Sequence, residues 1–229
     1  MSASALPYAL TSAYETLVEL LEDAAANSNC GLVRKTDPIR ACFASHEDNL
    51  AIFNCFLHLQ EWQARKQHLH ILLQVQESIK LGGGEPVLAQ STVTINYFKV
   101  NDNQAQLLQA LHFDYGPEQK SHPIFHAQLT NEGMALSPQV AAQIEFEFPQ
   151  LPCATCFKEA RIPTSDMTFP SVLLCLAADH FGEKFFTDFF ERLLEVQEKL
   201  PQPSFEKTRH SLQATPGHLR SSHWFAHMR

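Results

Sequence analysis

The sequence predicts an α+β fold: one domain with a mostly antiparallel β-sheet, flanked by an N-terminal helix and a C-terminal helical layer. Three observations favour it. Apolar residues recur with a 3.6-residue period near both ends of the chain, over residues 10–25 and 170–200. Between residues 51 and 148 the pattern is strand-like, and no crossover helix interrupts it. The 229 residues, 45% hydrophobic and 18% charged, are enough to bury a sizeable core.

The N-terminal helix is expected over residues 10–25. There Tyr14, Leu17 and Leu21 follow one another at helical spacing, so that they form one apolar face. Thr11 or Ser12 is expected to cap its start. A polar connection at residues 27–29 then leads into the sheet.

Six segments in the middle of the chain are predicted to be strands. Apolar and polar side chains alternate in them, or β-branched and aromatic residues dominate. The segments are residues 51–59, 68–76, 91–100, 107–115, 122–130 and 144–148. Turn residues separate some of them, as at 82–86 and 101–103.

Two helices are predicted after the sheet. Pro170 suits the first turn of one helix, which runs through Leu176. A second helix follows Gly182, and its phenylalanines and leucines repeat at helical spacing opposite charged residues. We interpret this phenylalanine stripe as core. Residues 201–229 form a basic, histidine-rich C-terminal segment of the same single domain, which spans residues 1–229.

The charge distribution along the chain indicates which partners it can bind. The first 200 residues carry 13 basic and 24 acidic side chains, a net charge of −11. Residues 201–229 carry four basic side chains and one acidic side chain, a net charge of +3. An acidic body repels phosphates, so extended nucleic acid is disfavoured as a partner of the body. The C-terminal segment is interpreted either as docked through its aromatic residues or as a phosphate-binding arm.

The chain is expected to be cytoplasmic and without a membrane partner. It contains no run of 18 apolar residues, and its start lacks the features of a signal peptide. The six cysteines are therefore interpreted as reduced thiols, with Cys42, Cys55 and Cys175 as small core residues. Cys153 and Cys156 form a CxxC pair, but a structural zinc site needs two more ligands. Metal binding by this pair stays open, and the sequence identifies no cofactor.

Two neighbouring predicted strands carry the candidate site. Their apolar residues must face the same buried side of the sheet, which fixes the parity of the strand register but not which residues pair. These residues are Leu107, Leu111, Phe113 and Tyr115 on the first strand, and Phe125, Ala127 and Leu129 on the second. The ionisable residues between them then gather on the opposite side. The candidate site residues are His112, Asp114, His122 and His126.

Three interpretations of this cluster are open. In a structural role, Asp114 and His122 would hydrogen-bond to the loop at 116–121, and the other histidines would line the sheet. In a catalytic role, Asp114 would orient an imidazole while two histidines share acid and base duty, as in metal-independent phosphodiester cleavage. Its phosphate contacts would come from Lys99, Lys120 or Arg161. In the third role, His112, Asp114 and another histidine would bind a divalent transition metal with water in an open position.

The segments 111–115 and 122–128 resemble a hairpin of uncharacterised bacterial proteins, some of them similar to toxins of small toxin–antitoxin or defence modules. Residues 161–170 and the helix after them are similar to the same proteins, so the resemblance covers about a third of the chain. It implies a bacterial cytosolic protein that works with a protein partner encoded by a neighbouring gene, which we call the neighbour-encoded protein. We therefore expect an interaction component of such a system. The alternatives are a hydrolase or ribonuclease that uses the histidine–aspartate cluster, and a divalent metal-binding protein.

Overall fold

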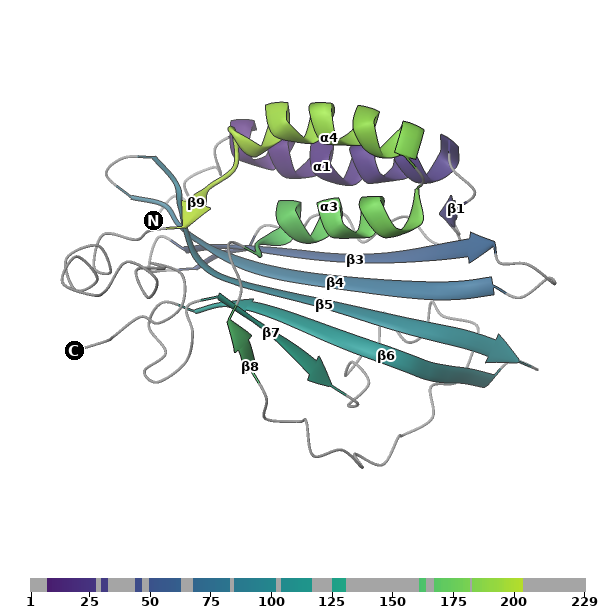
Figure 1. The fold of residues 1–229 in the computed structure, drawn as a ribbon. Coiled ribbons are helices and arrows are strands. Elements are labelled where there is room, and N and C mark those ends of the chain that lie inside the picture. Colours follow the sequence, from purple (N-terminus) through teal and green to yellow (C-terminus); the bar gives the residue numbers. More distant parts are fainter. Residues whose placement is uncertain are drawn as a thin grey trace, which may run out of the picture.

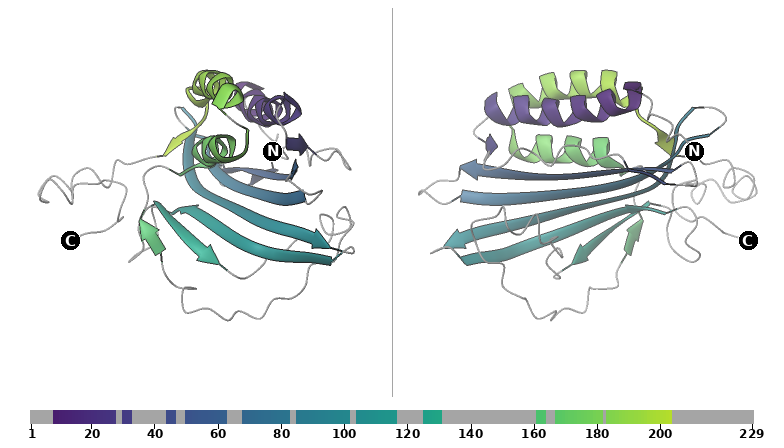
Figure 2. Two further views of the ribbon diagram at one scale, coloured as in Figure 1. Left: turned by 45° about the vertical axis from the view of Figure 1, so that its right-hand side comes forward. Right: turned by 180° about the vertical axis from the view of Figure 1, so that it is seen from behind.

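The computed structural model describes residues 8–27, 30–32, 44–46, 50–62, 68–82, 85–101, 104–116, 125–130, 161–163, 167–181 and 183–203. Within these residues, three helices lie on one face of a single twisted sheet (Figure 1). The views from other sides show the helices on the same face of the sheet, with α3 closer to it than α4 (Figure 2). The predicted α+β fold with a mostly antiparallel sheet is confirmed.

The sheet is built on four long strands that follow one another as an antiparallel meander: β3 (Leu50–Trp62), β4 (His68–Lys80), β5 (Val87–Asn101) and β6 (Gln104–Tyr115). Shorter strands extend it on both sides: β7 (Phe125–Thr130) and β8 (Arg161–Pro163) after β6, and β1 (Cys30–Leu32) and β2 (Ala44–His46) along β3. Among the described strands, only β9 (Gln202–Pro203) runs parallel to its neighbour, which is β5.

The long strands have two chemically different sides. On the side toward the helices, residues such as Phe53, Ile71 and Val93 are completely buried in one continuous core. We call the opposite side the distal face; on β5 and β6 it carries Thr92, Thr94, Asn96, His112 and Asp114. Because side chains alternate along a strand, the apolar positions of the core determine which residues the distal face receives.

The helices complete the core. α1 (Tyr8–Asn27) buries Tyr14, Leu17 and Leu21, as its periodicity predicts. It begins before Thr11 and Ser12, so the prediction that one of them caps its start is wrong. α3 (Phe169–His180) begins with Pro170 in its first turn, also as predicted. α4 (Glu183–Gln197) packs against both of them (Figure 1) and buries Phe189 and Leu193. None of the described helices combines the length and apolar character that crossing a bilayer requires.

Some sequence-based expectations need correction or lie outside the described residues. Cys55 is a core residue, and burial raises the pKa of its thiol to about 12. Cys175, however, is exposed, so its prediction as a core residue is wrong. At this point of α3 the next two residues, Leu176 and Ala177, face the core instead. Cys42, the predicted strand at 144–148 and the Cys153–Cys156 pair lie outside the described residues.

Candidate functional site

The pairing of β6 with β7 positions the candidate site, and it matches the predicted parity. Tyr115 lies opposite Phe125, Phe113 opposite Ala127, and Leu111 opposite Leu129. The prediction is wrong for two residues: Leu129 is exposed, and Leu107 lies opposite Phe98 beyond an irregularity that shifts the register. Tyr115 and Phe125 are fully buried and stack with ring centroids 4.7 Å apart. Their burial holds the two strands in register, so the residues that alternate with them along each strand, Asp114 and His126 among them, face the distal side.

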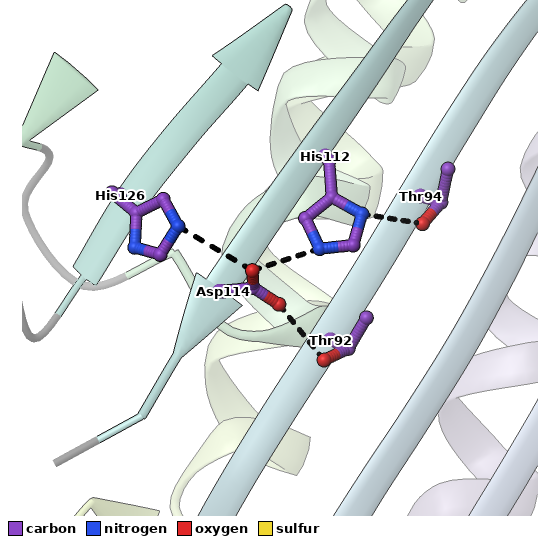
Figure 3. A network of polar contacts seen from close by, with 5 residues as sticks. All are labelled: Thr92, Thr94, His112, Asp114 and His126. Atoms are coloured by element: carbon purple, nitrogen blue, oxygen red, sulfur yellow. Dashed lines mark hydrogen bonds and ion pairs between the residues drawn. The ribbon is translucent and has the colours of Figure 1, made fainter. Parts of the chain in front are cut away.

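Asp114 is the centre of the site. It lies directly opposite His126 across the strand pair, and His112 lies two residues before it on the same strand. The Nε2 atom of His112 is 2.8 Å from Oδ2 of Asp114, and the Nε2 atom of His126 is 3.4 Å from the same oxygen (Figure 3). One carboxylate oxygen therefore serves two imidazoles.

Two threonines of β5 complete the network, and the sequence analysis did not include them. Thr92 lies opposite Asp114 and donates its hydroxyl to Oδ1 at 2.8 Å. Thr94 lies opposite His112, with its hydroxyl oxygen 3.1 Å from Nδ1 (Figure 3). The sequence contains a signal for them, because both alternate with the apolar Val93 and Ile95 along that strand.

The network keeps Asp114 ionised. Burial alone would raise the pKa of this carboxyl group, but the interactions with His112, His126 and Thr92 lower it well below its usual range. The carboxylate side chain is 21% exposed, so these contacts act in a partly desolvated setting.

The two histidines differ in access and in the use of their nitrogens. His126 is buried, with 3% of its side chain exposed, whereas 31% of the His112 side chain is exposed. In the neutral tautomer of His112 that donates Nε2–H to Asp114, Nδ1 accepts a hydrogen bond from Thr94. Both nitrogens of the more accessible imidazole are therefore engaged within the protein.

Other candidate residues do not join this cluster. His122 and Lys120 lie outside the described residues. Lys99 pairs with Leu69, whose side chain is part of the core, so Lys99 is on the helix side of the sheet. The expectation that Lys99 contacts a phosphate at this cluster is wrong. Side chains alternate along a strand, so Lys99 lies on the helix side, whereas Thr92 and Thr94 lie on the distal face. Arg161 pairs with Gln128 in the backbone register of β7 and β8.

A metal site has no support within the described part of the chain. No group of three or more histidine, cysteine, aspartate or glutamate side chains there is arranged to hold an ion. The Nε2 atoms of His112 and His126 both lie against the same oxygen of Asp114. A metal would need these nitrogens to point at a shared vacant position instead.

The distal face carries two further polar features. His58 and His70 stack with ring centroids 5.2 Å apart, and Nε2 of the first is 3.0 Å from Nδ1 of the second. One of these nitrogens must donate and the other must accept, so the pair holds a single proton at the contact. Asn96 is fully buried, and neither of its amide atoms has a hydrogen-bond partner.

A second buried network lies on the helix side, around Glu77. This carboxylate accepts hydrogen bonds from the hydroxyl groups of Tyr14 and Ser91 and from the backbone N–H of Phe169, the first residue of α3. Burial, followed by the charge and hydrogen bond of Glu77, raises the pKa of Tyr14 well above its usual range. We interpret the network as a structural link between α1, the sheet and α3, because these donors surround the carboxylate.

No family model, curated protein or solved structure matches this chain. A functional hypothesis therefore has to rest on the residues of the chain itself.

Proposed function

We propose that this protein is a cytoplasmic interaction component of a bacterial toxin–antitoxin or defence-type system, and that it acts by binding a protein partner. The observation that carries the protein-binding part of the proposal is the outer side of α4, whereas the toxin–antitoxin or defence context rests on the resemblance of segments 111–115 and 122–128. Phe190 and Leu194 are 36% and 45% exposed there, although other apolar residues of the same helix already fill the core. Exposed apolar side chains grouped on one helix are typical of a protein-binding surface.

The sheet supports the same proposal indirectly. His112 has both ring nitrogens engaged and His126 is almost inaccessible, so neither presents a vacant nitrogen on the surface. A general base must reach the proton that it removes. The cluster in this arrangement suits a structural polar network better than acid–base chemistry.

The test is complex formation with the neighbour-encoded protein. Co-expression followed by size-exclusion chromatography with light scattering should show a stable complex. Replacing Phe190 and Leu194 by serine should weaken it at least tenfold in a calorimetric titration, since central apolar contacts dominate interface energies. Leu108→Ser is the matched control, because Leu108 is 47% exposed but lies on β6. A wild-type protein that forms no complex would overturn the proposal.

A second candidate function, a hydrolase, is favoured by one specific observation. Thr94, His112 and Asp114 form a chain of hydroxyl, imidazole and carboxylate with contacts of 3.1 and 2.8 Å. Such chains activate a hydroxyl for nucleophilic attack in unrelated folds. RNA degradation and ester hydrolysis, measured for wild type, His112→Ala and His126→Ala together with metal content, test this candidate and the metal-binding alternative. Activity that His112→Ala abolishes in a folded protein would favour the hydrolase.

A further inference from the structure

The exposed Phe190 and Leu194 continue a line of apolar residues along α4 that begins with the half-buried Phe186. Phe186, Phe190 and Leu194 are spaced by four residues, so they lie on the same side over a length of about 12 Å. The rings of Phe186 and Phe190 stack with centroids 6.1 Å apart and an angle of 16° between their planes. Phe186 also packs against the core, which anchors one end of the line. We call these three residues the α4 stripe.

Acidic side chains border the α4 stripe on its solvent side. Glu191 and Glu195 each follow a stripe residue directly, and both are exposed. At about 100° per residue they lie next to the stripe, whereas Arg192 is turned toward α1. Arg192 is 3.2 Å from Asp23 of α1, so its charge is partly compensated there. The neighbouring α1 adds to this acidity, because it contains four acidic residues and no basic one.

We infer that the α4 stripe binds a basic amphipathic helix of the partner protein, an inference that rests on the proposed function. A straight line of apolar side chains at helical spacing is complementary to the apolar face of another helix. Lysine or arginine residues beside that face would meet Glu191 and Glu195. A second copy of this chain would bring the same carboxylates against one another, which disfavours self-association.

The probe is a fluorescently labelled 18-residue helical peptide of leucine and lysine, whose binding to the full chain is followed by anisotropy. We expect affinity to fall at least tenfold in Phe190→Ser/Leu194→Ser and severalfold in Glu191→Lys. It should also fall severalfold between 50 and 200 mM salt, because exposed charge pairs are screened. The matched peptide with glutamate in place of lysine should not bind.

Matched controls separate a specific site from general attraction to an acidic protein. Leu108→Ser removes an equally exposed apolar side chain, and Glu85→Lys makes the same charge change in an exposed turn. Both should bind the peptide as wild type does. Thermal unfolding of each variant verifies that its fold is intact. Equal affinity of the stripe variants and these controls would overturn the inference.

Two further outcomes would each contradict the inference. If the neighbour-encoded protein binds through Phe190 and Leu194 but the basic peptide does not, the inference is wrong while the proposed function stands. The C-terminal segment of this chain is also basic and contains Trp224 and Phe225. If Lys207→Glu/Arg209→Glu raises peptide affinity tenfold or more, that segment occupies the stripe, and the inference of an external helix is wrong.

Discussion

His112 and Asp114 lie two residues apart on β6, and their side chains meet on the distal face with Nε2 of the histidine 2.8 Å from Oδ2 of the aspartate. Neighbours at this spacing share a face of any strand. The contact therefore depends little on distant parts of the fold. The opposing His126 and Thr92 depend on the register of three strands, and they convert a local pair into a network across the sheet.

Asp114→Asn should destabilise the fold by about 1.5–3 kcal/mol at pH 7, the usual range for hydrogen bonds to a charged group. The amide replaces the charged acceptor of His112 and His126, and it weakens the bond from Thr92. Urea unfolding measures the change. Glu85→Gln, which removes an exposed carboxylate, should stay within about 0.5 kcal/mol of wild type. Equal effects of the two substitutions would mean that the network adds no stability.

The stability contributed by Asp114 should depend on pH. The pKa of this carboxyl group is lower in the folded chain than the value of about 3.9 expected when unfolded. The unfolded state therefore binds the proton more readily on acidification. The contribution is present above about pH 4 and is lost as the pH falls through the folded-state pKa. The difference in unfolding free energy between wild type and Asp114→Asn, measured from pH 7 to pH 3, should shrink at the acidic end. A constant difference would contradict this.

The hairpin could be predicted from the sequence because burial and strand periodicity leave little freedom. Once Tyr115 and Phe125 face the core, Asp114 and His126 have to share the opposite face; that they lie directly opposite one another is set by the register, which parity alone leaves open. The threonines could not be assigned in the same way, since their position opposite β6 depends on the register between β5 and β6. An irregularity between Tyr97 and Phe98 shifts that register along the strand pair.

The hydrogen-bond partners of Glu77 could not be predicted from the sequence for a different reason. It occupies an inward position of β4, in line with Leu73 and Val75, where a charge is unexpected. Its donors come from α1, from β5 and from the start of α3, between 14 and 92 residues away. Local periodicity indicates that an inward carboxylate needs donors, but only tertiary packing shows which residues supply them.

Glu77→Ala should cost about 2–4 kcal/mol, because it removes a buried charged acceptor and leaves its donors without a partner. Tyr14→Phe should cost less, about 1–2 kcal/mol, because the carboxylate keeps its other donors. Gln76→Ala is the matched control: this neighbouring residue is exposed on the distal side, and its change should be within about 0.5 kcal/mol. Urea unfolding at pH 7 measures all three. A Glu77→Ala protein as stable as the control would show that the network is not a structural link.

Asn96→Val should stabilise the fold by about 1 kcal/mol. The amide of Asn96 is fully buried without a hydrogen bond, so nothing compensates for its loss of hydration. Valine removes this cost and also favours a strand. Thr94→Val, two residues earlier on the same face, should do the opposite, because it removes the hydroxyl that contacts His112 and should cost about 0.5–1.5 kcal/mol. Comparison of the two midpoints of urea unfolding tests both expectations. If Asn96→Val destabilises the protein as much as Thr94→Val, the Asn96 amide forms a favourable interaction in solution. The centre of the distal face would then be more polar than the contacts of Asn96 indicate.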